Sequence, residues 1–304
     1  MKVEQALESV LACPVCHGRL VRVGDRIACR TCDENFSIVD EIPVLMNRGQ
    51  GVQEAERRMR DAVAAEVADA DESAMAIVRL HHCVPVMEQR AIEFRSSFAA
   101  SEFVLDVGIG YGWHWRGSGT GAPVIGVDMS LGSLRVARHL LRDEDNVFLI
   151  CADAAALPIR DCSIAGVWSV QVFQHFTDDL FMRVQRELDR VLAKRFAIEI
   201  YNLNPASAHR VIYQLFRKPF HVRGRLGEME LNRLSGTEAL QKWGTLREGR
   251  TTVGYGFSEL FFHPNFRVRP SHYPARLERF LTRTLPFLSR SIARQVHVRV
   301  ESKE

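Results

Sequence analysis

Short apolar runs alternate with longer amphipathic stretches from residue 103 onward. The apolar runs occupy residues 103–108, 124–128, 147–153, 165–170 and 196–201. Between them, apolar side chains recur on one face at helical spacing. Apolar strands separated by amphipathic helices are typical of a parallel sheet covered by helices on both faces. The sequence therefore predicts a doubly wound α/β fold, in which late strands at 266–273 and 295–302 bring the sheet to seven strands.

Three glycines, Gly108, Gly110 and Gly112, follow directly after the first apolar run. Glycine lets the backbone pass close beneath a ligand, where a side chain would intrude. Asp128 ends the next run, where a carboxylate can accept both hydroxyls of a ribose. A dinucleotide fingerprint needs a further glycine where this chain has Trp113, so nicotinamide and flavin cofactors are disfavoured. The alternative is that the glycines only make a tight turn between strand and helix.

Four of the seven cysteines form two C-x2-C pairs near the amino terminus. Cys13 and Cys16 make the first pair, and Cys29 and Cys32 make the second, twelve residues later. Two such turns can complete a tetrahedral tetrathiolate site, for which zinc is the natural metal. The competing interpretations are a redox dithiol and four unrelated thiols. His17 adjoins the first pair, but four cysteines already complete a closed site, so we expect a structural zinc ion.

The net charge of +3 conceals an uneven distribution. Residues 1–204 contain 22 basic and 29 acidic side chains (net −7), whereas residues 205–304 contain 18 basic and 8 acidic ones (net +10). A basic segment can mark an anionic partner, although a solvated arginine-rich face is the commoner explanation. No run of about 18 apolar residues is present, and the first ten residues lack the apolar stretch of a signal peptide. We therefore expect a cytoplasmic protein.

The segment around the cysteines resembles a family of small zinc-ribbon subunits that activate tRNA and protein methyltransferases. It is also similar to ribbons fused ahead of many bacterial methyltransferase domains. The resemblance covers about 40 residues and includes the second cysteine pair, Phe36 and residues 40–45, with Glu41 in place of the usual glycine. Residues 9–46 carry four basic and five acidic side chains, too few positive charges for phosphate recognition. A structural or docking role is therefore preferred over nucleic-acid binding.

The glycine loop resembles motif I of class I S-adenosylmethionine-dependent methyltransferases. The match consists of the string Asp106–Gly112, followed by Asp128 as the ribose acid. Residues 152–164 resemble the stretch in which an acid approaches the adenine amino group. Residues 169–176 resemble the segment at the mouth of the cofactor and substrate pockets, and residues 190–192 match the family's Arg-Val-Leu. The resemblance covers residues 103–201 well and the rest loosely.

The resemblance implies which residues bind the cofactor. They are Asp106, Gly108, Gly110, Gly112, Asp128, Met129, Asp153, Ala154 and Gln171. Residues 193–195 replace the family's usual Pro-Gly-Gly, at a turn remote from the cofactor. Methyl transfer mainly requires an acceptor held in line with the methyl group, and a base only where the acceptor must lose a proton. His175 is the first candidate for a catalytic base or substrate contact; the alternative is a histidine that only bonds the backbone.

Other aromatic and histidine side chains are weaker candidates. Tyr111, His114 and Trp115 follow the glycine loop and could form a lid over the cofactor, although packing is equally plausible. The remaining candidates are His81, His82, Tyr201, His209 and Tyr213. The first two lie in a helical connector and the others lie past the fifth strand, where acceptor-specific insertions commonly occur.

These observations predict three parts: a zinc ribbon at 1–50, a helical connector and cap at 51–100, and a methyltransferase domain at 101–304 with a helical insertion at about 202–250. The expected function is methyl transfer from S-adenosylmethionine to O or N of a small-molecule acceptor. One alternative is an rRNA or tRNA base methyltransferase, and another is a non-catalytic partner that keeps the cofactor fold. Peripheral membrane contact through residues 276–294 is a further possibility, because apolar residues there stand among arginines. The oligomeric state stays open.

Overall fold

The fold is that of a computed structural model, which describes most of the chain between residues 2 and 303. The described residues are 2–46, 57–58, 60–62, 64–65, 84–119, 121–204, 222–224, 227–229, 235–256, 280, 283–285, 289, 291, 293 and 295–303. Within them, no helix is long and apolar enough to cross a membrane.

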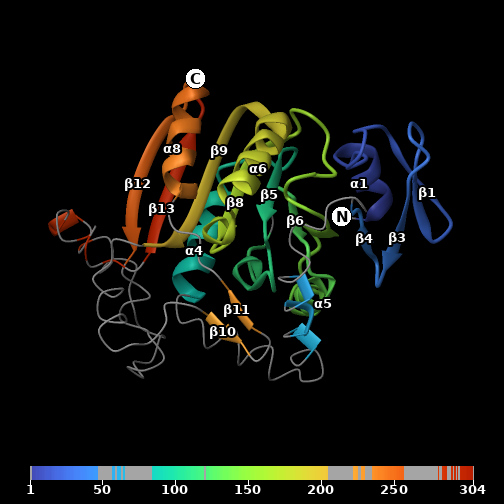
Figure 1. Ribbon diagram of the computed structural model, residues 1–304, viewed down its shortest axis with the longest axis horizontal. Coiled ribbons are helices and arrows are strands. Elements are labelled where there is room, and N and C mark those ends of the chain that lie inside the picture. Colours follow the sequence, from blue (N-terminus) through green and yellow to red (C-terminus); the bar gives the residue numbers. More distant parts are fainter. Residues whose placement is uncertain are drawn as a thin grey trace.

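One mixed sheet of eleven strands organises these residues (Figure 1). Its strands are β1 (Leu20–Val23), β2 (Arg26–Cys29), β3 (Asn35–Val39), β4 (Ile42–Val44), β5 (Phe103–Val107), β6 (Val124–Asp128), β7 (Val147–Cys151), β8 (Ile164–Val170), β9 (Leu192–Leu203), β12 (Arg250–Gly256) and β13 (Gln295–Glu301). The strand order is β1-β2-β3-β4-β7-β6-β5-β8-β9-β13-β12. Every pairing from β4 to β9 is parallel, and the pairings at both ends are antiparallel.

Helices cover both faces of the sheet, as a parallel core requires. The helices are α1 (Val3–Ser9), α4 (Val84–Arg95), α5 (Leu131–Leu140), α6 (Asp178–Val191) and α8 (Ser235–Leu246), with short 3-10 helices η1 (Trp113–Trp115) and η2 (Phe173–His175). Buried side chains of α1, α6 and α8 share one apolar cluster with the sheet. Those of α4, α5 and η1 share a second cluster. The strands between them are buried on both faces, which explains their continuous apolar runs.

The amino-terminal ribbon extends the sheet of the rest of the chain. Its last strand, β4, lies parallel to β7 with Val44 opposite Cys151, and the Leu45 N–H donates to the Cys151 carbonyl at 2.8 Å. Two ion pairs, Asp40 with Arg135 and Glu41 with Arg138, join the ribbon to α5. The ribbon therefore covers what would otherwise be the free edge of β7, and an uncovered strand edge is a liability for a soluble fold.

The α/β expectation is confirmed, whereas the expected count of seven strands is wrong for the sheet as a whole. The four ribbon strands continue the seven strands that follow them in the sheet order. The predicted strand at 295–302 matches β13, but its outer neighbour is β12, where the sequence predicted no strand. The other predicted late strand, at 266–273, lies outside the described residues.

The predicted helical insertion at about 202–250 is described only in part. The described portion contains α8 and two short strands, β10 (Val222–Gly224) and β11 (Gly227–Met229), which form a separate hairpin. Leu240 and Trp243 of α8 are buried in the core against the sheet, so this helix belongs to the covering layer. Of residues 276–294, only scattered positions are described.

Candidate functional site

The direction of chain progression through the sheet reverses between β5 and β8. From β5 the chain proceeds to β6 and β7 on one side, and later to β8 and β9 on the other. Open α/β sheets bind ligands in the crevice outside the carboxyl ends of the strands at such a point. The two connections meet closely here, because a side-chain carbon added to Gly108, after β5, would lie 2.3 Å from Val172, after β8.

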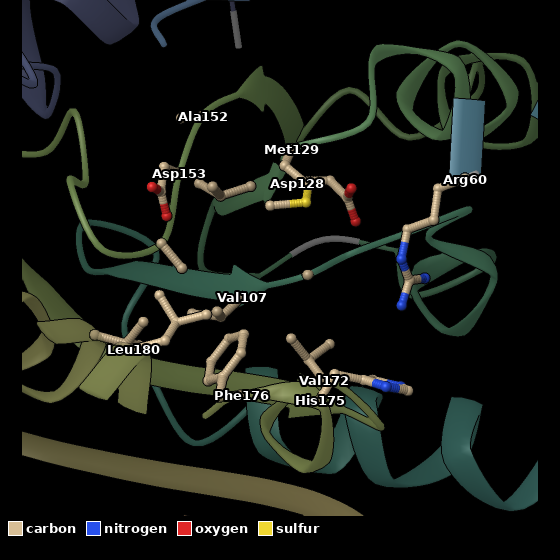
Figure 2. Close-up of a pocket in the computed structure, with 14 residues that line it drawn as sticks. Arg60, Val107, Asp128, Met129, Ala152, Asp153, Val172, His175, Phe176 and Leu180 are labelled. Carbon is tan, nitrogen blue, oxygen red and sulfur yellow. The ribbon is translucent and has the colours of Figure 1, made fainter. Parts of the chain in front are cut away.

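A hollow enclosing about 540 Å³ of space, part of it open to solvent, lies at these carboxyl ends. Its lining comprises Arg60, Val107, Gly108, Val127, Asp128, Met129, Ala152, Asp153, Ala154, Val172, His175, Phe176, Leu180 and Val184. Figure 2 shows Asp128, Met129 and Asp153 along one side, and the apolar side chains of Val172, Phe176 and Leu180, which flank η2 or belong to α6, along the opposite side. The hollow therefore combines an apolar wall with two separate carboxylates, a combination suited to a nucleoside.

Asp128 is held firmly at the end of β6. Its Oδ2 accepts the Gly110 N–H and its Oδ1 accepts the Ser130 N–H, both at 2.9 Å. Burial raises the pKa of Asp128, and the charge of Arg60 together with these two N–H donors offsets part of the rise. A carboxylate has about four lone-pair sites, so each oxygen keeps capacity for one more donor. Two hydroxyls on adjacent carbons match that remaining capacity.

The glycine loop has the backbone geometry that only glycine adopts readily. Gly108, Gly110 and Gly112 have φ values of 71°, 55° and 65°. A side-chain carbon on Gly110 would face open space, whereas one on Gly112 would lie 2.7 Å from Leu141. A side chain at Gly110 would therefore meet no neighbour, whereas Gly112 permits close packing against Leu141 at the end of α5. Of the three, only Gly108 lines the hollow.

Asp153 lies in the loop after β7, where the chain turns sharply. Its Oδ1 accepts the Ala155 N–H at 2.8 Å, and its carbonyl accepts the Ala156 N–H at 3.0 Å. Asp153 and Ala154 line the hollow, and Asp153 lies at the end remote from Arg60 (Figure 2). The apolar side chains of Val172, Phe176 and Leu180 face this loop across the hollow and could cover one face of a planar base.

The four cysteines of the ribbon come together in a tight cluster. Their sulfur atoms all lie within 4.8 Å of one another. The Sγ atoms of Cys13 and Cys32 are 3.7 Å apart, and those of Cys16 and Cys29 are 3.5 Å apart. Four thiolates bound tetrahedrally to zinc at about 2.3 Å would have sulfur–sulfur edges of about 3.8 Å. The cluster therefore fits the predicted metal site.

Backbone donors support two of these sulfur atoms. The Val15 N–H donates to Cys13 at 3.4 Å, and the Thr31 N–H donates to Cys29 at 3.3 Å. Burial raises the pKa of Cys13 to about 12. Burial also opposes ionisation of Cys29, but backbone N–H donors and neighbouring thiols outweigh it and lower its pKa to about 7. A cation beside the buried Cys13 sulfur would favour its thiolate form, as a bound metal ion does.

Comparison with known protein families gives one match. A family model described as "Methyltransferase domain" matches residues 104–195, which run from β5 into β9 and include the glycine loop, Asp128 and Asp153. Residues 104–195 are therefore similar to a methyltransferase domain. A search of curated proteins found no match.

Solved structures give a likeness in fold. A complex between the Haloferax volcanii Trm112 methyltransferase activator and a methyltransferase has a TM-score of 0.51 at 18% identity, covering 82% of this chain and 97% of that one. A geranyl diphosphate methyltransferase in complex with S-adenosylmethionine has a TM-score of 0.48 at 17% identity, covering 84% and 93%. A methyltransferase from Archaeoglobus fulgidus has a TM-score of 0.45 at 16% identity, covering 82% and 97%. At 18% identity, the similarity to the Haloferax volcanii complex shows a shared fold and nothing more.

The fold brings five of the predicted cofactor residues to the hollow: Gly108, Asp128, Met129, Asp153 and Ala154. His175, the candidate base, also lines it, at the end of η2. Gln171 does not line the hollow; it has a φ of 58° and its N–H donates to the Tyr201 carbonyl at 2.7 Å. Its cofactor role stays a prediction.

Asp106 lies beneath the glycine loop and is fully buried. One oxygen, Oδ2, is bonded to His114 Nε2 at 2.7 Å and accepts the Trp115 Nε1–H at 2.6 Å. His114 and Trp115 are therefore turned inward, where Trp115 packs against Trp168. Their side chains fill the core under α4 instead of covering the hollow. Asp106 supports the loop from below, and its cofactor role stays a prediction.

Arg60 is a residue of the hollow that sequence reasoning missed. It belongs to the predicted connector, far from the glycine loop in sequence, and no motif marks it. The next residue, Asp61, accepts the Ser130 hydroxyl at 2.7 Å and the Gly132 N–H at 3.0 Å, which fixes this segment at the start of α5. A side-chain carbon on Gly132 would lie 3.1 Å from Asp61, so glycine permits the contact.

The other candidate residues lie elsewhere. Tyr201 is buried under α4, where its hydroxyl donates to Glu199 at 2.6 Å. His81, His82, His209 and Tyr213 lie outside the described residues.

Proposed function

We propose that the protein is an S-adenosylmethionine-dependent methyltransferase that modifies O or N of a small-molecule acceptor. The observation that carries the proposal is Asp128, a buried carboxylate at the switch point of a methyltransferase domain with one remaining acceptor site on each oxygen. A ribose diol is the cofactor feature that fits it. The opposed apolar wall and Asp153 suit the adenine of the same cofactor.

The residues of the hollow fit the cofactor part by part. Asp128 would accept the two ribose hydroxyls, and Asp153 would accept the adenine amino group. The open space at Gly110 would admit the amino-acid portion next to the backbone. The charge of Arg60 offsets part of the rise that burial causes in the pKa of Asp128, and Arg60 would offer a positive charge at that end of the hollow. None of these contacts requires a pyrophosphate, in agreement with Trp113 at the position of a third fingerprint glycine.

Bound S-adenosylmethionine supplies an activated methyl group on a sulfonium, which is an excellent leaving group. The protein then has to hold the acceptor atom in line and to exclude water. His175, half-buried on η2 at the hollow, is the side chain best placed to remove a proton from a hydroxyl or ammonium acceptor. Its role is separable from cofactor binding, because the ribose and adenine acids lie on other elements.

The ribbon favours a small acceptor over RNA. Its near-neutral charge offers no phosphate-binding surface, and its β4 edge is used to extend the domain's sheet. The cysteine cluster would hold one zinc ion as a closed structural site, with all four ligands supplied by protein.

The proposal is tested by calorimetry of the zinc-loaded chain with S-adenosylhomocysteine, followed by incubation with labelled S-adenosylmethionine and a metabolite extract. We expect saturable binding and transfer of label to small molecules. Transfer of label to tRNA or rRNA fragments, with binding that weakens steeply with salt, would instead establish the RNA alternative. Cofactor binding without transfer to any fraction would favour a non-catalytic partner.

A further inference from the structure

The loop that carries Asp153 is bonded to the first turns of the ribbon. The Ala12 N–H donates to the Pro158 carbonyl at 3.0 Å, and the Arg160 N–H donates to the Val10 carbonyl at 2.9 Å. Leu11 and Ile159 form a β-bridge between the two segments, and both side chains are fully buried. Residues 158–160, at the far end of this loop, are therefore paired with residues 10–12, although about 150 residues separate them in sequence.

The side chain of Arg160 strengthens this pairing. Its guanidinium donates to three carbonyl groups at the end of α1: those of Leu7 at 2.8 Å, Leu11 at 3.2 Å and Ser9 at 3.4 Å. The last carbonyls of a helix have no partner within the helix, and a cation there also interacts favourably with the helix dipole. Arg160 thus satisfies carbonyl groups at the end of α1 and, through the same hydrogen bonds, holds the carboxyl-terminal part of the loop against the ribbon.

A second arginine holds the same loop from the opposite side. Arg190 of α6 donates to the Ile159 carbonyl at 2.7 Å and to the Leu157 carbonyl at 3.0 Å. Glu187 accepts the Leu157 N–H at 2.8 Å and pairs with Arg190. The loop is therefore hydrogen-bonded on one side to α6 of the methyltransferase domain and on the other side to the end of α1 in the ribbon. Asp153 lies at the start of this loop.

We propose that Arg160 is a positioning residue for the cofactor site, through which the ribbon sets the conformation of the loop that presents Asp153. The inference rests on the proposed function, because the loop matters only if Asp153 contacts a nucleoside. The ribbon then has a role beyond covering the edge of β7, because the amino-terminal segment bonds residues 158–160 of the loop. Loss of that anchor leaves the strand edge covered by β4 but lets the loop sample other conformations.

The test compares variants on two different contacts between ribbon and domain. Arg160→Ala removes the loop anchor, and Arg160→Lys keeps the aliphatic stem and charge but loses the guanidinium fork. Arg135→Ala is the matched control, because the Arg135 contact with Asp40, at 2.7 Å, joins the ribbon to α5 without touching the loop. S-adenosylhomocysteine affinity is measured on the full zinc-loaded chain below each variant's unfolding temperature, together with amide hydrogen exchange of residues 152–161 and of β5 and β6.

We expect Arg160→Ala to weaken S-adenosylhomocysteine about tenfold, equivalent to about 1.4 kcal/mol. Exchange should accelerate in residues 152–161 but not in β5 or β6. Arg160→Lys should fall between this variant and the original chain, and Arg135→Ala should stay within about twofold. Unchanged affinity in both Arg160 variants, or equal losses in Arg135→Ala, would overturn the inference. If Arg160→Ala does not fold, the comparison of Arg160→Lys with Arg135→Ala decides. Failure of the unsubstituted chain to bind would instead refute the proposed function.

Discussion

Asp128 offers the sharpest perturbation of the proposed cofactor site. Asp128→Ala removes the proposed acceptor for two ribose hydroxyls. Hydrogen bonds to a charged group contribute about 1.5–3 kcal/mol each. Taking the lower value for both gives about 3 kcal/mol, a weakening of S-adenosylhomocysteine binding of roughly 150-fold. The substitution also leaves the N–H groups of Gly110 and Ser130 without their carboxylate partner, so some stability should be lost as well.

The assay must distinguish the loss of the ribose hydrogen bonds from a disturbance of the glycine loop, whose Gly110 N–H also bonds Asp128. Calorimetric affinities are measured for S-adenosylhomocysteine and for its 2′,3′-dideoxy analogue, with the unfolding temperature of each protein as a check. In the unsubstituted chain the analogue should bind about as weakly as the natural ligand binds to Asp128→Ala. In the variant, removing the hydroxyls should cause little further loss. Equal sensitivity to the hydroxyls in both proteins, or unchanged affinity in the variant, would refute the assignment of Asp128 to the ribose.

Three further predictions follow from burial, the cysteine cluster and the glycine loop. Because burial raises the pKa of Asp128 and hydroxyl donors favour the ionised form, S-adenosylhomocysteine affinity should be full above that pKa and fall as pH drops through it, while Asp128→Asn shows a flat profile by titration calorimetry. Cys29→Ser should lose the zinc found by elemental analysis and lower the unfolding temperature, whereas Cys162→Ser, exposed and outside the cluster, should do neither. Gly108→Ala should weaken cofactor binding and stability, because its new carbon would lie 2.3 Å from a valine; Gly24→Ala has a similar φ of 64° with open space around it, so an equal effect there would contradict the steric explanation.

The central part of the fold was readable from sequence because its determinants are local. Five apolar runs between residues 103 and 201 correspond to β5 through β9, since strands buried on both faces must be apolar throughout. The glycine loop and Asp128 could be predicted for the same reason, because both lie at strand ends: the loop begins directly after β5, and Asp128 is the last residue of β6. The spacing of the two cysteine pairs is sufficient to predict a metal site, and the structure brings all four cysteines together.

What the sequence did not reveal depends on contacts between distant segments. Strand β12 is an edge strand whose exposed residues do not alternate with buried ones, and its pairing with β13 is what makes it a strand. Nothing in the ribbon's sequence indicates that β4 would join β7 and lengthen the sheet to eleven strands. Arg60 likewise carries no motif, because its place at the hollow is set by Asp61 binding the start of α5.

The inward orientation of the His114 and Trp115 side chains is a second feature that the sequence does not predict. The aromatic cluster after the glycine loop suggested a lid, but a pattern of residue types does not say which way side chains point. Asp106 decides it, because a buried carboxylate needs donors and these two rings supply them.

Titration calorimetry of the full zinc-loaded chain with S-adenosylmethionine and S-adenosylhomocysteine tests the central claim most directly. We expect one saturable site with micromolar affinity for both ligands, and a weakening of both by roughly 150-fold in Asp128→Ala while the variant stays folded. Absence of heat up to millimolar ligand, with the chain shown to be folded and zinc-bound, would contradict it.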